Sequence, residues 1–586
     1  MKEIVETLVA QGLQTLAAQG VLTLPEGVRY TVERTRDPSH GDFASNVAMV
    51  LGKGAGLAPR AFAEKLIAAL PQSSQLAKVD IAGPGFINFT LVAGHQFAIV
   101  KTIHEKKAAF ARPNIGNGAK VLIEFVSANP TGPMHVGHGR GAAYGSALAN
   151  VMAATGYQVE REYYINDAGR QADVLAVSLW LRYLELLGEK VAIPSRAYPS
   201  SYVIDNARLL LDKYGDKFKR PYADVIRDIP ADSTEDGDAA KIVKEKHLDA
   251  LIERAKQLLG ADYRTVQDCG LNEQLGAIKA TLEKLNVTFD RWYSERTLVD
   301  TGAVESTLKR LREKDAVYEK DGAIWLKTEA YGDEKDRVLI KKDGALTYFT
   351  PDIAYHLDKL DRGYDLLIDV WGADHHGYIA RMRAAIEQLS GKGKQFHVAL
   401  IQFVTLSSGR MGKRSGNFVT LNDLIDEAGA DATRFFYLTR SPEQHLEFDI
   451  ELARSQSKDN PVYYIQYAHA RICSVFRNAV EKGLSYDAAL GLSEIGKLDH
   501  PKAGDVAVRL SQYPEMLAAA ARNEAPHMLT HYLNDLATDF HSWYNDDKVL
   551  VDDTVARNTR MVLCEATRIV LADGLAMLGV SAPEQM

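Results

Sequence analysis

The chain of 586 residues is poor in cysteine and has no internal repeat, low-complexity tract or long hydrophobic run. Its cysteines, Cys269, Cys473 and Cys564, are widely scattered, which excludes a CxxC metal site or a disulfide framework and fits a reducing cytoplasm. Because no run of about 18 apolar residues occurs, we expect no membrane-spanning helix. The N-terminal segment carries acidic residues and lacks the continuous apolar core and cleavage site of a signal peptide.

Positive charge is also scarce, because 77 acidic residues outnumber 69 lysines and arginines and the formal net charge is −8. The composition therefore does not indicate a nucleic-acid-binding protein. It does not exclude one either, since local basic patches rather than the total set the affinity for phosphates. The length exceeds that of one ordinary core, so we expect about three or four domains.

Residues 1–108 are expected to form a separate small α/β domain. Its expected elements follow one another as helix, strand, helix, helix and strand: about 2–19, 28–35, from near Asp42, from Pro59, and 78–91 with a Gly-Pro-Gly bend inside it. The segment 111–120, rich in Gly, Pro and Asn, is expected to be a linker.

A second domain, over 118–455, is expected to begin with a βαβ unit. A mostly apolar run over 121–129 predicts a buried parallel strand, a glycine-rich turn and a helix over 141–156 follow, and 157–166 predicts the next strand. Such a unit opens a doubly wound, Rossmann-like nucleotide-binding fold, so the fold class is α/β for this part.

The rest of the chain predicts an insertion and then a helical domain. Residues of about 170–345 are mostly helical in pattern and charged, which indicates a large insertion between the two halves of the sheet. From 456 to 586 the pattern is helical throughout. Short strands are expected within the insertion and after it: 292–297, 323–327, 365–374 and 397–406.

The turn after the first strand carries the sequence His135-Val136-Gly137-His138. Gly137 allows close approach of a ligand, and the following helix N-terminus offers free N–H groups, so the two imidazoles could donate to phosphate oxygens. A metal pair would need more ligands than lie nearby in the sequence. Two ordinary surface histidines would be the default interpretation of an isolated HxxH, and the strand, turn and helix around this one favour the phosphate site.

A second motif, SSGRMGKRSGN, follows the strand predicted over 397–406. Arg410, Lys413 and Arg414 could stabilise the charge of a triphosphate as it moves to the leaving group. The alternative is a solvated basic loop, and this motif alone does not decide between them.

Taken together, the two motifs resemble the HIGH and KMSKS elements of class I aminoacyl-tRNA synthetases. In the second motif only Met411 and Lys413 match the consensus, and Arg410 keeps the positive charge of the first position. Within that class the chain resembles arginyl-tRNA synthetases over nearly its full length. The segments that carry the resemblance are EFVSANPTGPMHVGHGRGA, REYYINDAGRQ, TYFTPDIAYH, DVWGADHHGY and LGVSAPEQM, with GDFASNVA and AGPGFINF in an additional N-terminal tRNA-binding domain and YIQYAHARI in an anticodon-binding domain.

The resemblance implies an enzyme that uses ATP with Mg²⁺ to form arginyl-adenylate and transfers arginine to tRNA(Arg), without a metal site of its own. It also implies a monomer in the cytoplasm, without a membrane partner. The implied catalytic residues are His135, His138, Lys413 and Arg410. The implied ATP-binding residues are His135, Gly137, His138, Met411 and Lys413.

An arginine pocket must hold a planar cation, which favours carboxylates in bidentate contact. The resemblance implies the following arginine-binding residues: Glu124, Ser127, Asn129, Glu295, Tyr348, Asp352 and Asp374. For Asp352 the alternative is an acidic residue that only stabilises a first helical turn, and the neighbouring pair His375-His376 could be structural.

Two rivals of other classes remain at this point. One is a non-catalytic RNA-binding protein on a synthetase scaffold, which the intact HVGH and Lys413 disfavour. The other is a nucleotidyltransferase with a similar turn, which would not need the long helical C-terminus. Among synthetases, the chain lacks the zinc-binding cysteines of cysteinyl enzymes and the larger editing insertion of isoleucyl-type enzymes.

Overall fold

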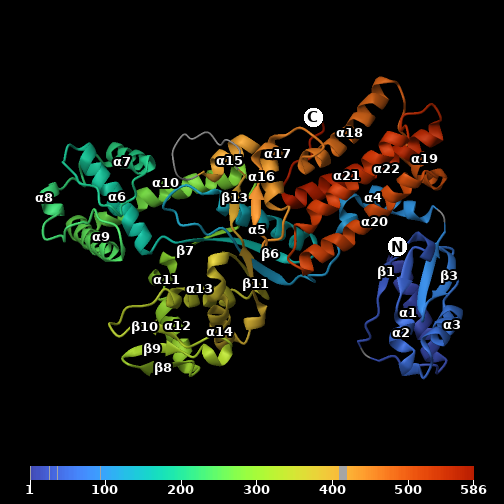
Figure 1. Ribbon diagram of the computed structural model, residues 1–586, viewed down its shortest axis with the longest axis horizontal. Coiled ribbons are helices and arrows are strands. Elements are labelled where there is room, and N and C mark those ends of the chain that lie inside the picture. Colours follow the sequence, from blue (N-terminus) through green and yellow to red (C-terminus); the bar gives the residue numbers. More distant parts are fainter. Residues whose placement is uncertain (1, 26, 36, 93, 408–418) are drawn as a thin grey trace.

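A five-stranded parallel sheet forms the centre of the computed structural model, which describes residues 2–25, 27–35, 37–92, 94–407 and 419–586 (Figure 1). The strands follow the order β12-β11-β5-β6-β7. Their bounds are Phe396–Ile401, Leu366–Gly372, Lys120–Glu124, Gln158–Ile165 and Arg291–Ser294. The predicted α/β fold class, with a doubly wound sheet at its centre, is therefore confirmed.

Helices cover both faces of this sheet. On one face, α5 (Val136–Ala154) packs on Val121 and Ile123 of β5. On the other, α13 (Phe349–Asp361) and α14 (Ile379–Ser390) pack on Leu122 and Leu367. The strands are buried on both sides, which explains their short apolar runs.

The stretch between β6 and α13 is not one insertion. Residues 292–297, expected as a strand inside it, instead overlap β7, which extends the central sheet by pairing with β6. Before β7 lies a helical lobe with its own core, at the left of Figure 1: α6 (Arg170–Leu186), α7 (Ser201–Tyr214), α8 (Tyr222–Val225), α9 (Asp238–Leu259) and α10 (Asp262–Lys284). After β7 come α11 (Arg296–Asp300), α12 (Ala303–Glu313) and the antiparallel strands β8 (Val317–Lys320), β9 (Ala323–Leu326) and β10 (Arg337–Ile340).

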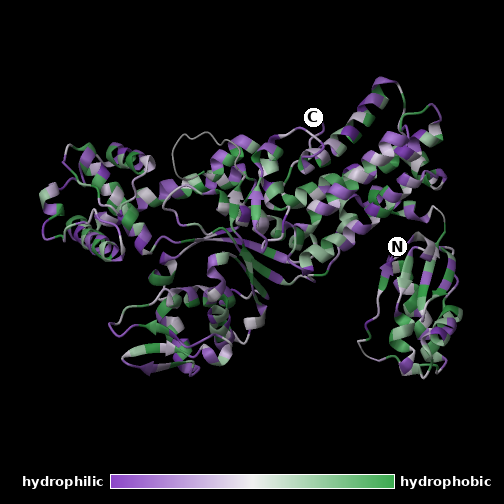
Figure 2. Ribbon diagram, in the orientation of Figure 1, coloured by the Kyte–Doolittle hydropathy of each residue, from purple (hydrophilic) through white to green (hydrophobic). Residues whose placement is uncertain are grey.

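The part of the chain after the central sheet is helical, apart from the short parallel pair β13 (Val404–Leu406) and β14 (Leu446–Phe448). Its helices are α15 (Leu421–Ala428), α16 (Ala430–Tyr437), α17 (Ile450–Arg454), α18 (Pro461–Glu481), α19 (Ala488–Ser493), α20 (Pro501–Arg522), α21 (Met528–Asp546) and α22 (Thr554–Leu578). Hydrophobic and hydrophilic residues both occur along these helices, as expected when one face of each is buried (Figure 2). Their core is continuous with the core around α5.

The N-terminal residues form a four-stranded antiparallel sheet with helices and a core of its own, at the lower right of Figure 1. The elements are α1 (Lys2–Ala18), β1 (Val32–Arg34), β2 (Phe43–Ser45), α2 (Val47–Leu51), α3 (Pro59–Ala69), β3 (Leu76–Ala82) and β4 (Phe86–Leu91), and α4 (Ala98–Lys106) follows. Two expectations were wrong. The segment after Asp42 begins as β2, because Phe43 and Ser45 both point into the core between β1 and β4, and the Gly-Pro-Gly bend separates two strands rather than bending one.

No helix in the described part of the chain combines the length and the hydropathy needed to cross a bilayer.

Candidate active site

Two adjoining cavities open at the carboxyl ends of β5 and β11, where ligands bind in open parallel sheets. The HVGH cavity, about 620 Å³, is lined by His135, Gly137 and His138. The acidic cavity, about 230 Å³, is lined by Glu124, Asp352 and other residues of β6, α13 and α14. Both cavities share the lining residues Val126, Ser127, Val370, Trp371, Gly372 and His375.

The HVGH turn is a helix cap built from two histidines. The Gly137 N–H donates to Nδ1 of His135 at 3.1 Å, and the His135 N–H donates to Nδ1 of His138 at 3.2 Å. The two rings stack with centroids 3.6 Å apart. Since each Nδ1 accepts a hydrogen bond, the proton of each neutral ring lies on Nε2. The pair therefore offers two neutral N–H donors.

The histidines stay neutral because of where they lie. Burial lowers the pKa of His135. Burial, and secondarily the neighbouring His135, lowers the pKa of His138 to about 3. Neither ring then carries a positive charge at neutral pH, so both act as hydrogen-bond donors rather than as cations.

Contacts at the start of α5 and at its middle hold the helix in place. The buried Arg140 guanidinium donates to the carbonyl oxygens of Gln402 at 2.9 Å and Ser441 at 2.8 Å. The Tyr437 hydroxyl donates to the Val136 carbonyl at 2.6 Å. A side chain at Gly145 would lie 2.3 Å from the Phe125 ring, so only glycine lets the helix approach β5 this closely.

The backbone between the two cavities is strained. Val126 has φ 70° and Ser127 has φ 41°, in the left-handed region that a β-branched residue such as valine seldom adopts. Such conformations cluster at functional sites, where the surrounding structure enforces them. The turn directs Ser127 so that its hydroxyl donates to Glu124 Oε1 at 2.8 Å and accepts from the Tyr164 N–H at 3.1 Å.

The acidic cavity concentrates negative charge. Burial raises the pKa of Asp352, and the Tyr378 hydroxyl, which donates to its carboxylate, opposes that rise. Glu295 does not line the cavity, but burial and then the nearby Asp352 raise its pKa to about 7. Its buried Oε2 has no hydrogen-bond partner among the described residues. Buried carboxylates with spare acceptor capacity suit a cationic ligand.

The other predicted residues are dispersed around these cavities. Asn129 lines the HVGH cavity and donates to Gln171 at 2.8 Å. Asp374 lines the same cavity, with its carboxylate 3.7 Å from His375 Nε2. Tyr348 is 82% exposed just before α13 and lines neither cavity. Arg410, Met411, Lys413 and Arg414 lie outside the described residues.

Sequence reasoning missed a buried polar network beneath the acidic cavity. Lys359 Nζ donates to Glu124 Oε2 at 2.6 Å and to Asp369 Oδ1 at 2.8 Å, and His356 Nε2 lies 2.8 Å from Asp369 Oδ2. Burial would raise the pKa of Asp369, but Lys359 and His356 outweigh it and hold that pKa at about 2. Two sequence features could have indicated this network. The apolar strand segments VLIE and LLID each end in a carboxylate, and the helical segment HLDKLDR has basic side chains spaced three residues apart.

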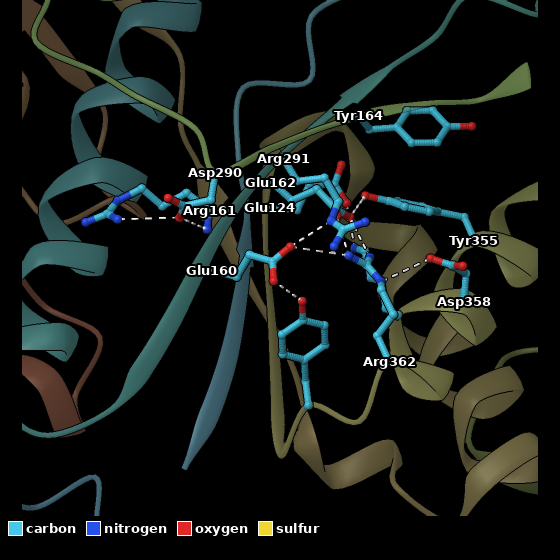
Figure 3. A network of polar contacts seen from close by, with 12 residues as sticks. Glu124, Glu160, Arg161, Glu162, Tyr164, Asp290, Arg291, Tyr355, Asp358 and Arg362 are labelled. Atoms are coloured by element: carbon cyan, nitrogen blue, oxygen red, sulfur yellow. Dashed lines mark hydrogen bonds and ion pairs between the residues drawn. The ribbon is translucent and has the colours of Figure 1, made fainter. Parts of the chain in front are cut away.

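The network continues along β6. Arg362 makes a bidentate pair with Glu162, at 2.6 and 2.9 Å, and the Tyr355 hydroxyl donates to the same carboxylate at 2.6 Å (Figure 3). Arg291 of β7 approaches Glu162 to 3.5 Å. The contact face between α13 and the sheet therefore combines apolar packing with a row of buried ionic contacts.

Comparison with known proteins gives a consistent result along the whole chain. Three family models match: the arginyl tRNA synthetase N terminal domain over 3–91, the class I (R) tRNA synthetase catalytic domain over 99–194 and 256–442, and the DALR anticodon binding domain over 465–586. The arginine–tRNA ligases of Thioalkalivibrio sulfidiphilus and Hydrogenovibrio crunogenus are 49% and 47% identical, each with 100% of both chains covered. The solved arginyl-tRNA synthetase of Thermus thermophilus has the same fold, with a TM-score of 0.74 at 23% identity over 100% of both chains.

Proposed function

The chain belongs to the arginyl-tRNA synthetase family of class I enzymes, and from this membership we propose how its residues divide the work of joining arginine to tRNA. The activity itself, aminoacylation of tRNA with arginine, follows from the full-length match to arginine–tRNA ligases. The class I catalytic domain implies the use of ATP. The observation that carries the residue assignment is a carboxylate-lined cavity that adjoins the HVGH cavity.

Arginine is proposed to lie with its side chain in the acidic cavity and its α-carboxylate toward the HVGH cavity. Asp352 and Tyr378 line only the acidic cavity, whereas Ser127 lines both. The guanidinium group therefore meets Asp352, with Glu295 adding negative charge nearby. Glu124, beside Ser127, is then close to the α-ammonium group. Tyr348 and Asp374 remain proposed arginine contacts on the family resemblance.

ATP is proposed to occupy the HVGH cavity, with its phosphates at the N-terminus of α5. The Nε2–H groups of His135 and His138, together with the helix dipole, suit phosphate oxygens. Mg²⁺ is proposed to arrive bound to ATP and to keep phosphate and water ligands. Among the described residues no group of three His, Cys, Asp or Glu side chains is arranged to hold a metal ion.

The reaction needs little covalent work from the protein. The arginine carboxylate attacks the α-phosphorus, pyrophosphate leaves, and the terminal ribose hydroxyl of the tRNA then attacks the adenylate and releases AMP. Positioning and charge stabilisation supply the rate. Arg410, Met411 and Lys413 are proposed to act on the triphosphate, as the matching class I motif implies.

The tRNA is proposed to contact both ends of the chain, residues 1–108 and 456–586. On α18 the exposed ring of Tyr467 stacks on Tyr463 and His541, and the Arg471 guanidinium lies 4.6 Å from its centroid. Aromatic rings with an adjacent guanidinium suit the bases of a single-stranded loop. A monomer acting in the cytoplasm completes the proposal, on the family resemblance.

The test is ATP–pyrophosphate exchange with each of the twenty amino acids, in the presence of total tRNA. Only arginine is expected to support exchange. A neutral side chain would leave the buried carboxylates without a counter-charge, and the ammonium group of lysine lacks the planar fork that pairs with a carboxylate in bidentate contact. Comparable exchange with a neutral amino acid or with lysine would contradict the pocket assignment.

A further inference from the structure

Three carboxylates form a row across the central sheet at one register. Glu124 of β5 pairs with Glu162 of β6 on one side and with Asp369 of β11 on the other. All three are buried, with exposed fractions of 8%, 0% and 0%. Because side chains at one register point to the same face, the row faces α13.

The facing helix supplies a matching row of nitrogen-containing side chains. His356 and Lys359 of α13 and Arg362, which follows its last residue, are spaced three apart and so lie along one side of the helix. Arg362 pairs with Glu162, Lys359 is shared between Glu124 and Asp369, and His356 lies against Asp369. His356 Nδ1 also lies 2.7 Å from the Asp352 carbonyl oxygen, so both ring nitrogens face acceptors. Figure 3 shows the end of this row at Glu162.

Within the row, Glu124 differs from its neighbours. The two oxygens of Asp369 contact Lys359 and His356, and both oxygens of Glu162 contact Arg362. Glu124 gives one oxygen to Lys359. Among the described residues its other oxygen accepts only the neutral Ser127 hydroxyl, and the side chain lines the acidic cavity. A carboxylate oxygen accepts two hydrogen bonds, so Oε1 retains capacity for a further donor.

The charge state of Glu124 depends on what surrounds it. Burial is the largest influence and raises its pKa, the negative Asp369 raises it further, and Lys359 and His356 lower it. Tyr164 and Tyr355, which also line the cavity, carry no charge at neutral pH, since a tyrosine ordinarily titrates near pH 10 and burial raises the pKa of both further. Lys359, which is fully buried, makes the closest positive contact to Glu124. An ammonium group pairs with the ionised carboxylate and not with the protonated acid.

We propose that Lys359 is a positioning residue for arginine: it acts through Glu124, keeping that carboxylate ionised and turned toward the acidic cavity to accept the α-ammonium group of the substrate. This inference rests on the orientation of arginine proposed above. Lys359 itself touches no reacting atom.

The test compares arginine with 5-guanidinopentanoate, which lacks only the α-amino group. In aminoacylation at saturating ATP and tRNA, the KM for arginine and the Ki of the analogue are measured for the wild type and for Lys359→Met. The wild type should prefer arginine by about tenfold to a hundredfold, the scale of one charge-assisted hydrogen bond. Lys359→Met should lose most of that preference through a higher KM for arginine, with the Ki little changed, and Lys359→Arg should retain part of it.

Arg362→Met is the matched control, because it removes the next cation of the same helix from the neighbouring carboxylate without touching Glu124. It should leave the ratio of KM to Ki as in the wild type even if stability falls. If Lys359→Met does not fold, Lys359→Gln is measured instead, which removes the charge but keeps an N–H donor for the buried carboxylates, and the same loss of preference is expected.

Equal weakening of arginine and analogue in the Lys359 variants would overturn the proposal and make Lys359 a purely structural residue. A preference retained in Lys359→Gln would overturn it as well. If the wild type shows no preference, the proposed orientation of arginine fails, and the inference fails with it. If the wild type prefers arginine and the Lys359 variants keep that preference, the role inferred for Lys359 is wrong and the proposed orientation of arginine still stands.

Discussion

At the scale of single residues, the site separates neutral donors from buried acids. His135 and His138 present N–H groups without charge, whereas Asp352 and Glu295 are carboxyl groups whose pKa is raised by burial. The first pair suits an oxygen-rich anion, such as the triphosphate of ATP. The second pair suits a cation that stabilises the ionised carboxylates, such as the guanidinium group of arginine.

His138→Ala should lower the rate of adenylate formation at least about a hundredfold, the scale for losing one preorganised donor. The KM for arginine should change little, because His138 lines only the HVGH cavity. Pre-steady-state adenylate formation measures the effect, with His376→Ala as control, since His376 is exposed and lines neither cavity. Near-normal turnover would remove His138 from the catalytic residues.

The pH dependence of arginine binding should report Glu295. Its pKa near 7 means that the free enzyme holds a proton there below neutral pH, and this proton must leave before the carboxylate pairs with the guanidinium. The KM for arginine should therefore fall about tenfold between pH 6 and pH 8. In Glu295→Gln most of this change in KM with pH should be absent. The same change in KM in both enzymes would assign the titration to another group.

At the scale of elements, the close contact between α5 and β5 positions the HVGH turn. Gly145→Ala should lower the melting temperature, because the added methyl group meets the Phe125 ring and overpacking of this kind costs about 1–3 kcal/mol. Gly276→Ala is the matched control on α10. That position is exposed with no atom near the added group, so the change should raise helix stability by up to about 1 kcal/mol. Equal melting temperatures for the two variants would contradict this account of α5.

Some elements could be predicted from the sequence and others could not, for physical reasons. The β5–α5–β6 unit was predictable because its apolar runs and glycine turn are local signals. The strand β2 was not, since only its pairing with β1 and β4 makes Phe43–Ser45 extended. The assignment of β7 to the central sheet likewise depends on a partner more than a hundred residues away in the chain.

The same distinction applies to the site. The HVGH turn and the candidate Asp352 could be recognised from contiguous motifs. The function of Lys359 depends on the relative register of β5 and β11 and on the rotation of α13, neither of which is a local property. A charged residue in a helical pattern is ordinarily solvated, so the spacing of the cations in HLDKLDR does not by itself show that this lysine is buried.

At the scale of the whole molecule, the helical C-terminal part shares one core with the catalytic sheet. Buried Arg434 illustrates this, because its guanidinium donates to Leu578 at the end of α22, to Leu285 after α10 and to Ser146 of α5. Deleting the residues from 456 onward would expose this core. Surface substitutions are therefore the better test of coupling between tRNA binding and catalysis.

Exchange of pyrophosphate into ATP should be negligible without tRNA and should rise with tRNA concentration, if the bound tRNA stabilises the active state. Tyr467→Ala should raise the tRNA concentration for half-maximal exchange about tenfold or more, the scale of one lost base stack. Val480→Ala, an exposed change on the same helix, is the control and should have no effect. Robust exchange without tRNA would contradict the coupling.

The central claim is that the acidic cavity recognises the guanidinium group through Asp352, and Asp352→Asn with the neutral isostere citrulline tests it most directly. Charge-assisted hydrogen bonds contribute about 1.5–3 kcal/mol each, so the KM for arginine should rise about tenfold to a hundredfold or more. The KM for ATP should stay nearly unchanged, and the strong preference of the wild type for arginine over citrulline should narrow. If the constants for arginine and ATP worsen equally, Asp352 only stabilises the start of α13 and the pocket assignment is wrong.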